Sequence, residues 1–126
     1  METIVWIAQG LLATAFLAAG SMKLMKSHAQ LLEMGDNMKW VEDFDPWHIK
    51  SIATAEVLGA IGLILPAALD IAPVLTPIAA LGLGLTMLGA AATHVRRGEL
   101  QALPANVVLL ALATFVAIER FGPHAL

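Results

Sequence analysis

Residues 76–99 read TPIAALGLGLTMLGAAATHVRRGE, and this stretch decides the fold. Residues 76–93 carry no charge, and about 20 mostly apolar residues suffice for a helix to cross a bilayer. The apolar run ends at His94, Arg96, Arg97 and Glu99, and basic residues are typical of the membrane edge. The stretch therefore predicts a transmembrane helix whose last turn meets water.

The composition of the whole chain also favours a membrane protein. Of its 126 residues, 59% are apolar and 13% are charged, whereas ordinary globular chains are about half apolar and about a quarter charged. The length predicts a single membrane domain over residues 1–126. A net charge of −3 argues against nucleic acid as a partner, and the absence of cysteine excludes disulfides and thiolate chemistry within this chain.

Four apolar windows predict the spanning helices, at about residues 3–24, 50–69, 72–95 and 103–121. A tight turn with Pro66, Asp70 and Pro73 is expected between the second and third, because proline ends helices. Gly98 and Pro104 separate the third from the fourth. Short connections place consecutive helices antiparallel, so we predict an all-α, integral membrane, up-down four-helix bundle.

The segment of residues 28–48 is polar and acidic, unlike the four windows that flank it. It carries Trp40, Phe44 and Trp47 at helical spacing, which gives one aromatic face. This pattern is typical of an amphipathic helix lying at the headgroup boundary. A solvated loop whose aromatic side chains cap the bundle is the alternative.

The basic residues predict the orientation of the bundle in a cell membrane. Six of the seven lie in or beside the first and third connections, namely Lys23, Lys26, Lys39, Lys50, Arg96 and Arg97. Arg120 alone lies toward the other side. The positive-inside rule then places these two connections in the cytoplasm and both termini outside.

Four polar side chains remain to be explained: Lys23, Glu56, His94 and Asn106, one on each predicted helix. At a rise of about 1.5 Å per residue, all four fall in the same cytoplasmic third of the bundle. Each shares a helical face with small residues, which mark close helix packing in lipid. We therefore predict that they converge in a polar cluster or a ligand-binding pocket.

Glu56 is the most informative of the four, because a carboxylate at the centre of a membrane helix costs about 2.5–3.5 kcal/mol. By depth, Lys23 is its nearest candidate partner and His94 the second. A structural knot that fixes helix register is the alternative to a functional pocket. Taken singly, Lys23 would extend to the headgroups, His94 would lie at the interface and Asn106 would cap its helix.

Other kinds of site are not expected. His28, His48 and His124 fall in loops or the tail, so Glu56 and His94 lack further ligands for a metal ion. No nucleophile elbow or phosphate-binding loop is present. The catalytic residues, and whether the chain catalyses a reaction at all, stay open.

Several stretches resemble the DoxX-like family of small four-helix membrane proteins: FLAAGSMKL (16–24), MKWVEDFDPW (38–47), AEVLGAIGLILPAALDIAPVLTPIAALGLGLTMLGAAATH (55–94), VRRGE (95–99) and NVVLLALATFVAIERF (106–121). The resemblance covers nearly the whole chain and implies the same four-helix architecture. Members of the family include the membrane subunit of a thiosulfate:quinone oxidoreductase, proteins of redox or sulfur stress, and assembly factors. The resemblance therefore implies a membrane partner or a quinone-related role.

Three functional hypotheses follow. The first is a membrane subunit that holds a small apolar ligand of the quinone type for a redox partner, with no cofactor of its own chain. The second is a non-enzymatic scaffold or assembly factor whose small-residue faces bind partner helices or further copies of the chain. The third is a small proton-coupled transporter that acts as an oligomer.

Overall fold

The computed structural model describes residues 2–125, except for the side chains of residues 36 and 37. Within this range every regular element is a helix: α1 (Glu2–Met25), α2 (His28–Leu32), the 3-10 helix η1 (Asp36–Asp43), α3 (Pro46–Leu69), α4 (Leu75–Arg97), the 3-10 helix η2 (Leu100–Ala102) and α5 (Leu103–Phe121). Four of these described helices, α1, α3, α4 and α5, are long and apolar enough to cross a membrane. The predicted all-α membrane fold is confirmed.

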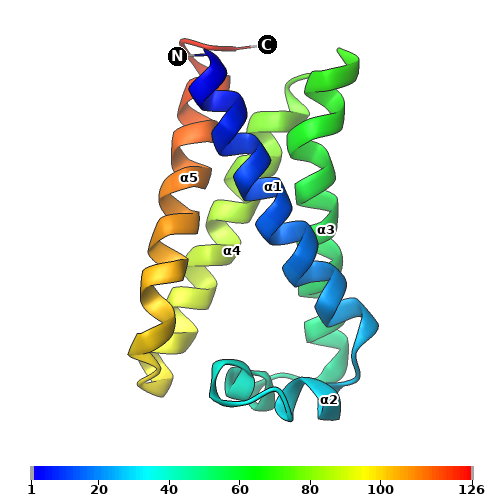
Figure 1. Cartoon of the computed structure of the whole chain (residues 1–126), viewed down its shortest axis with the longest axis vertical. Coiled ribbons are helices and arrows are strands. Elements are labelled where there is room, and N and C mark those ends of the chain that lie inside the picture. Colours follow the sequence, from blue (N-terminus) through cyan, green and yellow to red (C-terminus); the bar gives the residue numbers. More distant parts are fainter. Residues whose placement is uncertain (1, 126) are drawn as a thin grey trace.

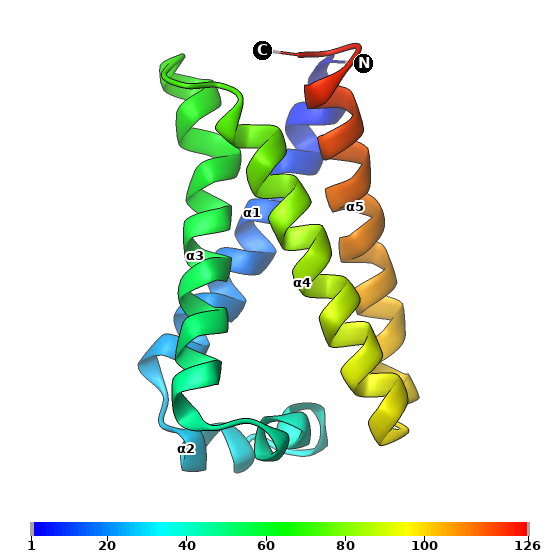
Figure 2. The same cartoon turned by 180° about the vertical axis from the view of Figure 1, so that it is seen from behind.

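The four long helices form a ring around a common core. α1 and α4 each make their main contacts with α3 and α5 (Figures 1 and 2). Consecutive long helices run in opposite directions, so both termini lie at one end, uppermost in Figure 1. Toward the other end the α1–α3 pair diverges from the α4–α5 pair, and α2 and η1 lie across that end.

Pro66 lies inside α3, which corrects the predicted turn that begins at this residue. The helix continues to Leu69, and Asp70 ends it with a left-handed φ of 54°. Proline has no N–H, so it leaves the carbonyl of Gly62, four residues earlier, without its helical donor. The Thr76 hydroxyl of α4 donates to that carbonyl at 3.2 Å. A neighbouring helix thus replaces the lost bond, as lipid-buried backbone requires.

The segment between α1 and α3 is not the single amphipathic helix predicted over residues 28–48. It forms α2 and η1, which are separated at Gly35, whose φ of 109° is favoured by glycine. α3 begins at Pro46, because proline suits the first turn of a helix. Trp47 therefore belongs to α3, is 63% exposed and stacks on the His48 ring. Its predicted place at the headgroup boundary remains a prediction.

A small core of its own holds η1 against the bundle. Leu31 of α2, Val41 of η1 and Ile49 of α3 pack together and are fully or almost fully buried. The His28 ring adds hydrogen bonds to the carbonyls of Val41 and Phe44 through Nε2. These contacts fix η1 on the α3 side of the bundle.

Apolar side chains fill the main core and also cover the outer faces of the bundle, as a membrane protein requires. The largest buried side chains of the main core include Leu12, Phe16, Leu63, Leu83 and Val116. Large apolar side chains also cover the outer faces of all four long helices, among them Ile7, Leu58, Leu85, Val107 and Ile118. Such outer faces suit acyl chains rather than water. The four spans therefore contact the lipid bilayer.

Candidate functional site

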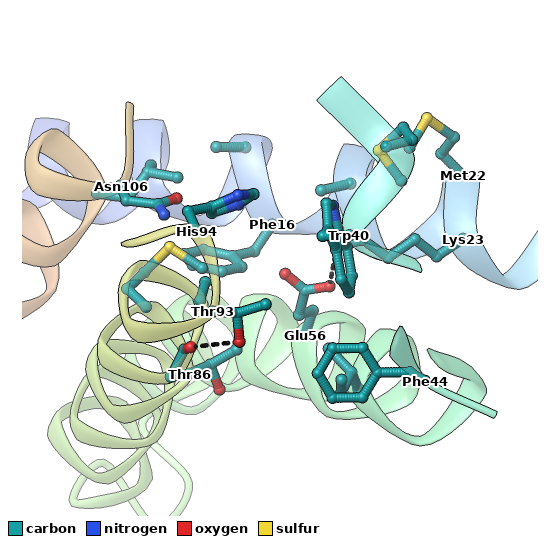
Figure 3. Close-up of a pocket in the computed structure, with 18 residues that line it drawn as sticks. Phe16, Met22, Lys23, Trp40, Phe44, Glu56, Thr86, Thr93, His94 and Asn106 are labelled. Carbon is teal, nitrogen blue, oxygen red and sulfur yellow. Dashed lines mark hydrogen bonds and ion pairs between the residues drawn. The ribbon is translucent and has the colours of Figure 1, made fainter. Parts of the chain in front are cut away.

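A cavity of about 520 Å³ lies inside the bundle toward the end where η1 crosses it. All four long helices and η1 contribute to its wall (Figure 3). Most of the lining is apolar, with Phe16, Met22, Met38, Trp40, Phe44, Ile52, Met87 and Leu109 as the large side chains. Ligand sites in proteins are usually concave, mainly apolar and of this size, so the cavity is the candidate functional site.

The structure places Lys23, Glu56, His94 and Asn106 on the wall of this cavity, one from each long helix. In Figure 3, Asn106 and His94 lie toward one side and Lys23 and Glu56 toward the other. The ring of Trp40 lies beside Lys23 and Glu56. The four polar side chains thus border one shared space, although they do not all touch one another.

Lys23 and Glu56 form a buried ion pair across the α1–α3 contact. Lys23 Nζ donates to Glu56 Oε1 at 2.6 Å, and the two side chains are 11% and 3% exposed. Gly20 lets the helices approach this closely, because a Cβ there would lie 2.8 Å from Val57 Cγ2 and 2.9 Å from the Ala53 carbonyl oxygen. The predicted first partner of Glu56 is therefore confirmed.

Lys50 contributes to the same helix end in a way that sequence reasoning missed. Its Nζ donates to the carbonyl oxygens of Lys23, Leu24 and Lys26 at 2.7–2.9 Å. A cation at these free carbonyls stabilises the C-terminus of α1. From the sequence, Lys50 is only a topological charge, since no local pattern indicates a cap from another helix.

His94 is not the second partner of Glu56; it binds Glu99. Gly98 ends α4 with a φ of 73°, and the turn brings the Glu99 N–H to the His94 carbonyl at 2.8 Å. The same turn places Glu99 Oε1 3.0 Å from His94 Nδ1. The helix stop and the carboxylate partner of His94 are thus encoded in one short stretch, residues 94–99.

Arg97 connects this turn to η1. Arg97 Nε donates to Glu99 Oε2 at 3.0 Å, and its two other nitrogens lie 2.7 Å from Glu42 Oε1 and 2.8 Å from Asp43 Oδ1. Burial raises the pKa of the Glu99 carboxyl, but hydrogen bonds from Arg97 and His94 outweigh it and leave that pKa below its ordinary value. Glu99 is therefore held as a carboxylate.

Trp40 is the cavity residue that sequence reasoning placed elsewhere. Its ring is 5.7 Å from Lys23 Nζ and meets the His94 ring edge-on, with 6.3 Å between centroids. Phe44 packs edge-on against it at 5.8 Å. The spacing of Trp40 and Phe44 correctly indicated a shared face, but that face meets the cavity.

Asn106 adds a hydrogen-bond donor that has no acceptor in the described part of the chain. Its Nδ2 atom is buried and has no hydrogen-bond partner there. A buried amide without a partner costs about 1–3 kcal/mol, so such groups usually meet a water or a ligand. Asn106 lies in the first turn of α5, and its side chain points toward His94 (Figure 3).

The chemistry of the cavity follows from these groups. Aromatic and aliphatic side chains suit a flat apolar ring, while the polar groups at its sides suit oxygen atoms on that ring. Among the side chains that the structure describes, no group of three His, Asp or Glu residues lies close enough to hold a metal ion. The polar side chains on the cavity wall thus offer hydrogen bonds to a ligand.

Comparison with known proteins places the chain in a family. Residues 7–116 match the model of the DoxX-like family. Neither curated proteins nor solved structures gave a match. The matched range includes every residue that lines the cavity and most of each spanning helix. This chain is therefore a multi-pass membrane protein, and it belongs to the DoxX-like family.

Proposed function

We propose that this protein is a membrane subunit that holds a small apolar ring ligand of the quinone type in the cavity, for use by a redox partner. The observation that carries the proposal is the combination of an apolar space of about 520 Å³ with polar groups from four helices at its sides. Most of the cavity wall is within the membrane-spanning segments, where quinones are dissolved.

The aromatic side chains support a planar ligand. Phe16, Trp40 and Phe44 line the cavity, and a ring seated between them would gain offset-stacked or edge-on contacts. Such contacts add about 0.5–1.5 kcal/mol to the burial of the ring itself. A flexible aliphatic ligand would not gain this term.

The polar side chains support oxygen atoms on that ring. Asn106 Nδ2 is a free donor on one side, and the Lys23 ammonium of the ion pair is a charged donor on the other. Carbonyl oxygens of a quinone are acceptors that would satisfy both. The chain contains no cysteine, so a thiol or iron–sulfur carrier would be contributed by the partner protein.

Retention of a quinone through purification tests this proposal. The protein is purified in mild detergent from quinone-containing membranes, and its lipid extract is compared with those of Glu56→Ala and Glu119→Gln. The wild type and Glu119→Gln, whose carboxylate pairs with His124 away from the cavity, should carry equal quinone. Glu56→Ala should carry at least several-fold less. Equal quinone in all three, or none in the wild type, would refute the proposal.

A scaffold function is the second candidate, because a groove lies on the outside of α3 and α4. This outer groove has a volume of about 360 Å³ and is lined by Ala55, Leu58, Gly59, Gly62, Leu75, Ile78, Ala79, Gly82, Leu83 and Thr86. Small side chains of this kind let another helix approach closely in lipid. A partner protein or a further copy of this chain would then bind there.

Two glycine substitutions separate the two candidates. A Cβ at Gly82, in the outer groove, or at Gly89, in the cavity, would have no atom within 4 Å. Gly82→Leu therefore fills the outer groove and Gly89→Leu obstructs the cavity without a clash at Cβ. Ligand binding predicts quinone loss in Gly89→Leu alone. A scaffold predicts loss of a stoichiometric partner in Gly82→Leu, with Gly89→Leu unaffected.

We also propose that the cavity end faces the cytoplasm of the cell membrane, because the basic residues gather there. The chain has no native cysteine, so single cysteines can be labelled cleanly. Gln101→Cys and Ala125→Cys lie at exposed positions at opposite ends of α5. A membrane-impermeant maleimide should label Ala125→Cys on intact cells and Gln101→Cys only after permeabilisation. The reverse pattern would contradict the orientation.

A further inference from the structure

The two ring nitrogens of His94 meet different surroundings. Nδ1 is 3.0 Å from Glu99 Oε1, across the turn at Gly98. Nε2 has no hydrogen bond to any group that the structure describes, and the ring itself lines the cavity (Figure 3). The cavity is therefore where Nε2 would find a partner.

Glu99 determines which nitrogen carries the proton in the neutral ring. A carboxylate accepts hydrogen bonds and cannot donate, so a neutral His94 must place its hydrogen on Nδ1. Arg97 keeps Glu99 ionised, because its Nε donates to the other carboxylate oxygen at 3.0 Å. The lowered pKa of the Glu99 carboxyl agrees with this geometry. Nε2 is then left as an unprotonated acceptor.

The other elements around His94 leave this arrangement undisturbed. η1 contributes the Trp40 ring, which meets the His94 ring edge-on and carries no charge. α5 contributes the neutral amide of Asn106. The charged groups of α1 and α3 on the cavity wall are Lys23 and Glu56, which bind each other. Glu99 is thus the one charged group bonded directly to His94 within the described part of the chain.

We propose that Glu99 is a positioning residue that holds neutral His94 as the Nδ1–H tautomer, so that Nε2 accepts a hydrogen bond from the hydroxyl of a bound ligand. The inference rests on the proposed function and specifies its ligand: the hydroxyl-bearing, reduced quinol binds in preference to the carbonyl-bearing quinone. A quinol O–H donates to Nε2, whereas a quinone oxygen would face it lone pair to lone pair. One such hydrogen bond corresponds to a preference of about fivefold to tenfold.

The chain contains a matched control for this pair. His124 Nδ1 bonds Glu119 Oε2 with the same spacing of five residues, but at the end of α5 near the termini. Neither residue lines the cavity. Glu119→Gln therefore removes a histidine–carboxylate pair of the same kind without touching the candidate site.

The first arm of the test needs no ligand. The ¹⁵N spectrum of histidine-labelled protein in detergent is recorded at mildly alkaline pH, where an ordinary imidazole is neutral. Wild type and Glu119→Gln should show His94 as the Nδ1–H tautomer, and Glu99→Gln should show a mixture, because an amide can also donate to Nδ1. A protonated, mixed or Nε2–H ring in the wild type would overturn the inference without reference to any quinone.

The second arm measures the ligand preference. Binding of a short-chain ubiquinone and of its quinol is measured by equilibrium dialysis in detergent under argon. Wild type and Glu119→Gln should bind the quinol about fivefold to tenfold more tightly, and Glu99→Gln should reduce that ratio to within about twofold. An unchanged ratio in Glu99→Gln, or no quinol preference in the wild type, would overturn the inference while leaving the proposed function intact. If the wild type binds neither compound, the proposed function itself fails.

Discussion

Lys23 Nζ lies 2.6 Å from Glu56 Oε1, and this ion pair joins α1 to α3 on the wall of the cavity. Both side chains are nearly buried, at 11% and 3% exposed. Isolated charges at such positions would be costly, and pairing offsets much of that cost. A buried pair can serve helix register, ligand binding or both, and these roles differ in what substitution should do.

A double-mutant cycle separates the two roles. Glu56→Leu or Lys23→Met alone leaves one charge buried without its partner and should destabilise the fold by about 3–5 kcal/mol. The double variant removes both charges and should return to within about 1 kcal/mol of the wild type. Reversible unfolding in mixed micelles measures these differences.

Ligand retention in the same double variant gives the second readout. The proposed function predicts that stability recovers while quinone retention does not, because the polar wall is lost. Full recovery of both stability and quinone retention in the double variant would mean that the ion pair serves helix register alone.

Gly20 should be required for the α1–α3 contact that brings this pair together. Gly20→Ala places a methyl group 2.8 Å from Val57 Cγ2 and 2.9 Å from a backbone oxygen, so α1 must move away. We expect destabilisation by about 1–3 kcal/mol in thermal unfolding. Gly10→Ala on the same helix meets no atom within 4 Å and should be neutral or stabilise by up to about 1 kcal/mol. Equal changes in stability for Gly20→Ala and Gly10→Ala would show that α1 and α3 do not make the close contact at Gly20.

Arg97 should hold η1 over the cavity. It contacts Glu42 and Asp43 of η1, whereas Arg96 is 69% exposed and its nearest contact to Asp43 is 3.9 Å. Because these pairs are partly exposed, we expect Arg97→Gln to make amide exchange in η1 only roughly fivefold faster. Arg96→Gln should leave exchange within about twofold of the wild type. Equal protection in both variants would mean that the small core of α2 and η1 holds the segment alone.

Arg120 should fasten α5 to α1 at the end opposite the cavity. Its side chain is fully buried; Nε donates to Gln9 Oε1 at 2.6 Å, and Nη1 donates to Glu2 Oε1 at 2.7 Å. Arg120→Met should therefore destabilise the protein by about 2–3 kcal/mol, with Arg120→Lys intermediate because it lacks the guanidinium fork. Quinone retention per folded molecule should be unchanged. A loss of quinone retention in Arg120→Lys would contradict this prediction, because it would mean that the contacts of Arg120 affect the cavity at the opposite end of the bundle.

The sequence predicted the features that depend on hydropathy and helical phase. The four spans follow from apolar runs, and the bounds of α5 agree with the predicted 103–121. Helical phase and depth placed Lys23, Glu56, His94 and Asn106 toward the interior, and the structure has all four on one cavity. The pairing of Lys23 with Glu56 was predictable because both residues lie at the same depth on inward-facing sides of their helices.

The features that were missed depend on contacts between segments. Trp40 has the periodicity of an interfacial aromatic residue, and only the turn at Gly35 directs it to the cavity. His94 binds Glu99 because a left-handed glycine folds the chain back, which depth along a helix does not reveal. The sequence places Arg120 only on the other side of the membrane, since no local pattern shows a buried partner 111 residues away.

A crystal structure grown in a lipid mesophase tests the central claim most directly. The account predicts Glu56 turned inward with its carboxylate on Lys23, and non-protein density in the cavity beside Trp40 and Asn106. Glu56 turned toward acyl chains, or separated from Lys23 by more than one helical turn, would contradict it. A cavity filled by the protein's own side chains would do so equally.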